Sequence, residues 1–180
     1  MIEYLIDFIY FFLNRIVAHI PIWNVRKLFY RIAGMKIGKR SRILMGCIVM
    51  SPWKIVLGNG VYINENCVVD GRGHVSIGDN TSISIGTKIF SGTHSTSSDS
   101  FEFMTRPVNI SNNVWTGIDA IVLPGTELPE GMVLAAGSVA IPKKEPYKAW
   151  HIYSGVPAEL IGKRGTETKY EQGSWRPILR

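Results

Sequence analysis

The sequence has little charge and almost no cysteine. Only 19% of its 180 residues are charged and 46% are hydrophobic, which excludes an intrinsically disordered chain. Its two cysteines, Cys47 and Cys67, are not in a metal-binding spacing. The N-terminus lacks a basic segment and a small-residue cleavage site, so no secretory signal is evident. We therefore expect one globular domain with a small appendage, located in the cytoplasm.

Charge is distributed unevenly along the chain. Residues 1–42 carry eight Lys or Arg and two Asp or Glu, residues 43–142 carry four and eight, and residues 143–180 carry eight and four. An acidic body between two basic ends argues against nucleic acid as a partner. It favours local binding of anions at the two ends.

Residues 2–20 are strongly apolar but do not predict a membrane-spanning helix. The polar exceptions, which fall within an arc of about 160° on a helix, are Glu3, Asp7, Asn14, Arg15 and His19. A packed or interfacial helix carries such a stripe, whereas a spanning helix does not. We expect two helices, 2–20 and 22–33, separated by Pro21. Two roles stay open: residues 1–35 cap the fold, or residues 1–42 also contact a membrane surface from its inner face.

Aliphatic residues recur at intervals of six. The positions are Ile37, Ile43, Val49, Leu57, Ile63, Val69, Ile77, Ile83 and Ile89, followed after a gap by Ile110, Thr116, Val122, Leu128, Leu134 and Ala140. A second column of mostly small residues stands four positions after the first. A step of six matches neither the 3.6-residue helix nor the two-residue alternation of a strand.

This interval predicts a solenoid with three flat faces. Each face contributes one short strand per coil, and each strand points one aliphatic side chain inward, so that stacked coils bury a continuous column. We predict an all-β fold of about five coils over residues 36–142. Cys47 and Cys67 are twenty residues apart and are expected as two small core residues in adjacent coils.

The repeat is interrupted once. The coil that should begin at residue 97 begins at Ile110, so thirteen extra residues leave a corner within 91–107. Insertions of this kind collect on the binding face of solenoids. The loop is small and polar and carries His94, whose residue type suits a general base near neutral pH. His74, twenty residues earlier, is expected at the equivalent corner of the preceding coil.

Four motifs resemble those of the hexapeptide-repeat acyltransferases, of the maltose, galactoside and colanic-acid acetyltransferase type. They are Ile77-Gly78-Asp79-Asn80, the run 110–117 (ISNNVWTG), the run 134–139 (LAAGSV) and the run 155–161 (GVPAELI). The resemblance covers roughly residues 36–164. It implies a left-handed parallel β-helix closed by a short C-terminal helix at 156–164. It also implies a homotrimer with active sites between subunits.

The resemblance also implies roles for individual residues. His94 matches the catalytic base. The tryptophan equivalent to Trp115 borders the thioester, and backbone groups nearby face the pantetheine arm of acetyl-CoA. The predicted CoA-binding residues are Trp115, Gly117, Ile118, Ala136, Gly137, Lys143, Lys144 and Arg164. The family's Thr-Lys pair near the nucleotide is replaced by Ile141-Pro142, so the lysines that follow are assigned to the phosphates only as a group.

The residues that would bind the acceptor are less clearly indicated by the sequence. Asn64 matches an asparagine that contacts the acceptor hydroxyl in sugar acetyltransferases, and Asp70 is a polar residue of the same region. The family's acidic partner is not reproduced, because Arg72 occupies that neighbourhood. Three histidines are needed for the zinc site of the related gamma-class carbonic anhydrases, and no such set is evident, so we expect no metal.

These observations predict an acetyl-CoA-dependent O-acetyltransferase that modifies a sugar hydroxyl of a surface polysaccharide by direct transfer. Acetyl-CoA is a cosubstrate, and no bound cofactor is expected. Residues 143–180 are assigned to the C-terminal helix and a basic tail. Two alternatives remain open: an N-acetyltransferase of an amino sugar, and a non-catalytic or metal-binding β-helix scaffold.

Overall fold

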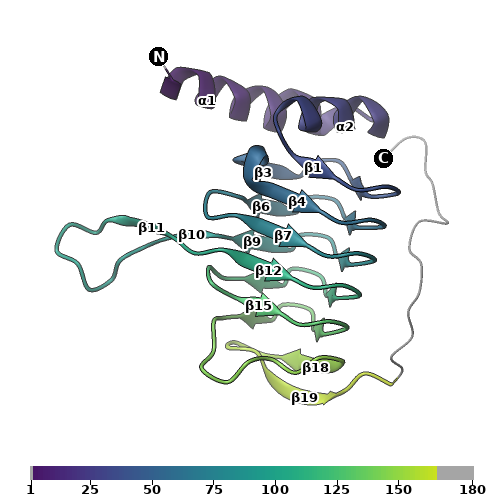
Figure 1. Cartoon of the computed structure of the whole chain (residues 1–180), viewed down its shortest axis with the longest axis vertical. Coiled ribbons are helices and arrows are strands. Elements are labelled where there is room, and N and C mark those ends of the chain that lie inside the picture. The colour runs from purple at the N-terminus through teal and green to yellow at the C-terminus, as the bar shows by residue number, and fades with distance from the viewer. Residues whose placement is uncertain (1, 166–180) are drawn as a thin grey trace.

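The chain forms a three-sided prism of stacked β-strands with helices across one end (Figure 1). The structure, a computed structural model, describes residues 2–165. The first sheet contains β1 (Lys36–Ile37), β4 (Ile55–Leu57), β7 (Val75–Ile77), β12 (Val108–Ile110) and β15 (Glu127–Leu128). The second contains β2 (Arg42–Ile43), β5 (Tyr62–Ile63), β8 (Ser82–Ile83), β13 (Trp115–Thr116), β16 (Val133–Leu134), β18 (His151–Ser154) and β19 (Glu159–Lys163). The third contains β3 (Ile48–Met50), β6 (Val68–Asp70), β9 (Lys88–Phe90), β14 (Ile121–Val122) and β17 (Val139–Ala140).

Three rows of turns form the edges of the prism. We call the first edge the turns that join the first sheet to the second, at 38–41, 58–61, 78–81, 111–114 and 129–132. The second edge joins the second sheet to the third, at 44–47, 64–67, 84–87, 117–120 and 135–138. The third edge leads from the third sheet to the next coil, at 51–54, 71–74, 91–107 and 123–126, and continues from 141 onward.

The six-residue repeat forms the core as predicted. Strands of neighbouring coils pair in parallel with repeat residues in register, as in the pairs Ile37–Leu57, Leu57–Ile77 and Ile77–Ile110. Every residue of the repeat is at most 6% exposed. The parallel β-solenoid is therefore confirmed, with five complete coils and a further partial turn at β18.

Small hydroxyl residues complete the core at the corners. The Thr81 hydroxyl donates to the Ser111 carbonyl in the next coil at 2.8 Å, and the Thr87 and Thr116 hydroxyls lie 3.1 Å apart. All three threonines are fully buried. Because a buried hydroxyl without a partner is costly, these bonds explain why small polar residues are tolerated in the inward column.

The N-terminal helices cover the open end of the first coil. They are α1 (Ile2–Phe11), the π-helical η1 (Phe12–Ile16), the 3-10 turn η2 (Val17–His19) and α2 (Trp23–Ile32). The Asn14 amide donates to the Val49 carbonyl at 3.0 Å and accepts from the Val49 N–H at 2.8 Å. This side chain takes the place of a neighbouring strand at the edge of β3. Within residues 2–165, no helix has the length and apolar character needed to cross a membrane.

Arg26 anchors the cap from within the core. It is fully buried, and its guanidinium donates to the Ile43 carbonyl at 3.1 Å and to the Ile20 carbonyl. Burial lowers the pKa of this guanidinium. The buried cation joins α2 to the first coil through backbone oxygens at a corner where strand pairing ends.

The predicted C-terminal helix at 156–164 is wrong. The segment forms β19, which pairs antiparallel with β18 across the turn around Gly155. The last coil leaves β18 as an unpaired edge, and a returning strand satisfies its backbone groups where a helix would not. The remainder of the predicted C-terminal tail, residues 166–180, lies outside the described residues.

The insertion at 91–107 forms a hairpin arm. β10 (Gly92–His94) pairs antiparallel with β11 (Phe103–Thr105), and the arm projects away from the prism (Figure 1). His74 and His94 both belong to the third edge, as expected for equivalent corners, but they do not occupy positions in register. Val75 pairs with Val108, so the counterpart of His74 in the next coil is Pro107. The hairpin carries His94 out of the column.

Candidate active site

His94 stands at the end of β10 between two aromatic rings of its own hairpin. The imidazole stacks on Phe101, with ring centroids 4.4 Å apart, and meets Phe103 edge-on at 5.5 Å. All three side chains are exposed. The two aromatic rings of the hairpin therefore orient the His94 imidazole. The part of the imidazole that they do not contact remains accessible to solvent.

A hydrogen bond determines which nitrogen of His94 carries the proton. Nδ1 lies 3.0 Å from the Phe101 carbonyl oxygen. A carbonyl can only accept, so Nδ1 is the protonated nitrogen, and in the neutral ring Nε2 keeps its lone pair. The imidazole is therefore arranged to take a proton through Nε2, as a general base requires.

An ion pair with a buried carboxylate supports the base of the hairpin. Asp70 is fully buried, and the Arg72 guanidinium donates to its two carboxylate oxygens at 2.9 and 2.8 Å. This bond raises the pKa of Arg72. The same guanidinium lies over the Phe103 ring at 4.6 Å. A chain of contacts thus runs from the core carboxylate through Arg72 and Phe103 to His94.

Gly92 allows this arrangement. A Cβ at this position would lie 2.8 Å from the Phe103 ring and 3.0 Å from the Asp70 carboxylate. Any larger residue would push the aromatic ring away from the hairpin base. Because Asp70 is buried against Arg72, the geometry favours a supporting role for it over the predicted direct contact with the acceptor.

The predicted pantetheine-binding residues line the second edge. Trp115 is 47% exposed, and its indole N–H donates to the Ser84 hydroxyl at 3.1 Å, which fixes the ring against the preceding coil. Ile118 is 54% exposed on the next turn of the same edge. Ala136 and Gly137 follow one coil later and are also exposed. Together they form an exposed strip with apolar side chains and accessible backbone.

The amides of this strip are partly engaged. The Gly117 N–H donates to the Leu134 carbonyl at 2.7 Å and the Gly137 N–H to the Ile118 carbonyl at 2.8 Å. These two amides hold coils together, so neither is available as an oxyanion donor. Asn64 lies two coils before Gly117 on the same edge, and its amide nitrogen donates to the Ile83 carbonyl at 2.8 Å.

The predicted phosphate-binding residues are divided between two other edges. Lys143 lies beyond β17 on the third edge and donates to the Ala158 carbonyl at 2.7 Å and the Glu159 carboxylate at 2.8 Å. The bond to Glu159 raises the pKa of Lys143. Lys144 beside it is exposed. Arg164 reaches the first edge, where it donates to the Asn113 and Gly131 carbonyls at 2.8 and 3.1 Å.

One chain does not bring the predicted residues into a single site. His94 leaves the third edge, whereas Asn64, Trp115 and the predicted pantetheine strip lie along the second. These edges are the opposite ends of the third-sheet strands. With three residues in β9, the separation is at least about 10 Å. Within one chain, the His94 arm and the predicted pantetheine strip are therefore separate.

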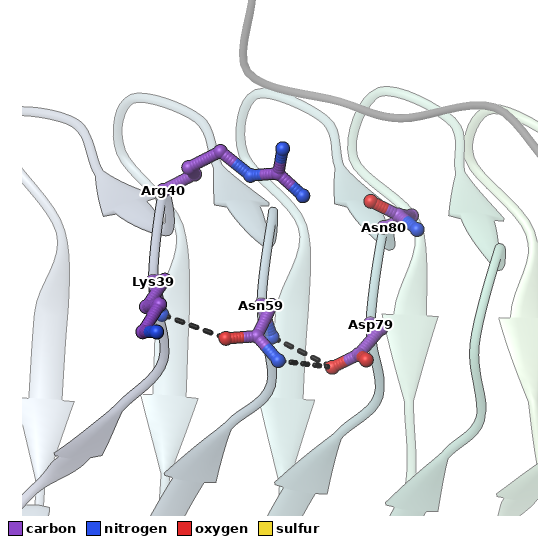
Figure 2. Close-up of a pocket in the computed structure, with 5 residues that line it drawn as sticks. All are labelled: Lys39, Arg40, Asn59, Asp79 and Asn80. Carbon is purple, nitrogen blue, oxygen red and sulfur yellow. Dashed lines mark hydrogen bonds between the residues drawn. The ribbon is translucent and has the colours of Figure 1, made fainter.

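The first edge contains a shallow pocket of a different kind. It has a volume of about 590 Å³ and is lined by Lys39, Arg40, Asn59, Asp79 and Asn80 (Figure 2). The Lys39 N–H donates to the Asn59 side chain at 2.8 Å, and the Asn59 N–H donates to the Asp79 carboxylate at 2.7 Å. Each side chain satisfies a turn amide of the preceding coil, so we interpret this row as structural.

Within residues 2–165, no group of three or more His, Cys, Asp or Glu is placed to hold a metal ion. Sequence reasoning also missed the aromatic pair Phe101 and Phe103 and the role of Arg72. The alternating phenylalanines in an otherwise small, polar loop were the available signal. Nothing in the sequence indicates that Arg72 turns back onto the Asp70 carboxylate.

This geometry defines a β-solenoid of six-residue repeats with one projecting hairpin arm that carries His94. No family model matches the chain. A putative colanic acid biosynthesis acetyltransferase of Escherichia coli K12, WcaF, is 28% identical over 143 residues, which cover 79% of this chain and 77% of the relative.

Two solved structures show the same architecture. The hexapeptide-repeat acetyltransferase VCA0836 of Vibrio cholerae, in complex with acetyl coenzyme A, matches with a TM-score of 0.80 and 22% identity over 92% of this chain and 90% of that one. A maltose O-acetyltransferase of Clostridium difficile matches with a TM-score of 0.77 and 22% identity over 88% and 85%. The predicted resemblance to hexapeptide-repeat acyltransferases is confirmed, as is the predicted enzyme class, since all three proteins are named as acetyltransferases.

Proposed function

We propose that this protein transfers an acetyl group from acetyl-CoA to a sugar hydroxyl, with His94 as the general base. The observation that carries the proposal is the His94 hydrogen bond to the Phe101 carbonyl, which leaves Nε2 as a proton acceptor. The similarity to acetyltransferases, one of them solved with acetyl-CoA, supports the choice of donor. The names of the colanic-acid and maltose enzymes favour a saccharide acceptor.

The reaction requires one proton acceptor and no covalent intermediate. Nε2 of His94 takes the proton of the acceptor hydroxyl as its oxygen attacks the thioester carbonyl carbon. The C–S bond then breaks, and the proton passes from the imidazolium to the departing CoA sulfur. The Nδ1–H bond to Phe101 stabilises the imidazolium formed between these steps.

We further propose that the active site lies between two copies of the chain in a closed trimer. The third edge of one copy supplies the His94 arm, and the second edge of the next supplies Trp115, the pantetheine strip and Asn64. The separation of these edges within one chain supports this arrangement. The exposure of Phe101 (63%) and Phe103 (45%) also supports it, because a partner edge would cover these rings.

The test is release of free CoA thiol from acetyl-CoA in the presence of a panel of saccharides, with the product identified by mass. Replacement His94→Ala should lower kcat by at least about 100-fold, because a general base contributes 10² or more. Replacement Ser97→Ala in the same loop is the matched control and should leave kcat unchanged. A His94→Ala variant that keeps more than half of the wild-type activity would refute the mechanism. Acetylation of amino sugars but not of hydroxyl acceptors would assign N-transfer instead.

A further inference from the structure

The outer face of the N-terminal cap is strongly apolar. The large apolar residues of α1 and α2 that are more than half exposed are Tyr4 (81%), Leu5 (59%), Phe8 (62%), Phe11 (59%), Leu28 (57%) and Ile32 (72%). Both helices lie across the end of the prism (Figure 1), and these side chains are not covered by the coils. Exposed apolar side chains in one continuous region mark an interaction surface.

A groove between the two helices makes this face continuous. It has a volume of about 270 Å³ and is lined entirely by apolar residues, namely Phe8, Ile9, Phe12, Leu13, Phe29, Ile32 and Ala33. Phe12 packs edge-on against Phe29 at 5.3 Å and joins the helices at its floor. The apolar surface therefore extends from α1 onto α2.

Positive charge predominates in the segment that carries the apolar face. Of the eight Lys or Arg in residues 1–42, Arg26 is buried in the core, whereas Lys27 and Arg31 lie on α2; the two acidic residues, Glu3 and Asp7, lie on α1. Lys27 on α2 is held close to other cations, and burial together with Arg31 and Arg42 lowers its pKa. Like charges crowded beside an apolar surface are stabilised when anions approach them.

We propose that the outer face of α1 and α2 docks on a membrane surface that contains anionic lipids. A bilayer interface provides an apolar layer for the phenylalanines and a negative surface for the cations of α2. The ten-residue α1 then lies in the plane of the interface, and the prism stands away from the bilayer. This docking does not depend on the acetyl transfer proposed above.

The experiment is flotation of the full chain with lipid vesicles. Vesicles of phosphatidylcholine with about 30% phosphatidylglycerol are compared with phosphatidylcholine alone, at about 0.1 M and 1 M salt. The chain should float with the anionic vesicles, and high salt should weaken the binding. The double replacement Phe8→Gln and Phe11→Gln should lower vesicle affinity at least about tenfold, because two half-buried rings leave the interface.

Matched controls are available at the opposite end of the prism. Val156 and Ile161 are 73% and 64% exposed on the β18–β19 hairpin, and replacing both by Gln should leave vesicle binding unchanged. Lys27→Gln should weaken binding to anionic vesicles by about fivefold. Thermal unfolding verifies that each variant is folded.

Two results would overturn the proposal. One is failure of the wild-type chain to float with anionic vesicles. The other is a change of oligomeric state, by light scattering without lipid, in the variant that lacks Phe8 and Phe11. That outcome would assign the face to contact between copies of the chain.

Discussion

Replacing Arg72 by Met should lower the free energy of unfolding more than replacing its partner Asp70 by Asn. Arg72 supplies two charge-assisted hydrogen bonds to Asp70, which is fully buried. Without them, the carboxylate keeps the bond from the backbone N–H of residue 72 at 3.0 Å. Losing one partner of a buried pair costs about 3–5 kcal/mol. Because the Arg72 side chain is 39% exposed, we expect a smaller loss than that range, about 2–3 kcal/mol.

The reverse replacement, Asp70→Asn, leaves the cation on the partly exposed side. Arg72 can then bond to water, and we expect a loss of only about 1 kcal/mol. The variant with both replacements should lose less than the sum of the two, because no uncompensated buried charge remains. Urea unfolding at constant m-value measures all three variants.

The order of the two single variants is the decisive result. If Asp70→Asn costs more than Arg72→Met, or if Arg72→Met costs less than about 0.5 kcal/mol, the buried carboxylate does not depend on Arg72. The contact of Arg72 with Phe103 adds a second readout. Arg72→Met should also lower kcat with little change in the KM for acetyl-CoA, because the hairpin that orients His94 loses its support.

Two further predictions concern contacts between coils. Gly117→Ala should strongly destabilise the chain, because a Cβ would lie 2.4 Å from a backbone nitrogen of the next coil, whereas Gly162→Ala, with nothing within 4 Å, should be neutral in thermal unfolding. Cys47 and Cys67 are free and buried, and the hydrogen bond with Cys67, together with burial, raises the pKa of the Cys47 thiol. Both should therefore resist thiol reagents until the protein unfolds, and rapid labelling of the native chain would contradict the packed corner.

The core could be predicted because the sequence pattern that specifies it, one inward residue every six positions, is local. Each strand of the solenoid needs one inward residue, so the spacing of Ile77, Ile83 and Ile89 specifies the coil directly. The position of the insertion followed from the same count. Only the interval was needed, and no long-range contact had to be known.

The site was predicted less completely because it depends on contacts that leave no periodic pattern. The sequence indicated His94 but not the stacking of Phe101 or the return of Arg72 onto Asp70. The helix predicted at 156–164 failed for a similar reason. The segment forms a strand because β18 would otherwise be an unpaired edge, and that edge exists only once the last coil has formed.

The central claim is that catalysis uses the third edge of one chain and the second edge of another. The direct measurement mixes two inactive variants, His94→Ala and Ala136→Trp, by joint unfolding and refolding. In a closed ring, random assembly of equal amounts creates intact sites at about a quarter of the interfaces. Recovery of about 25% of wild-type acetyl transfer is the predicted result. If the mixture stays as inactive as its components while the copies demonstrably exchange, the active site does not lie between subunits.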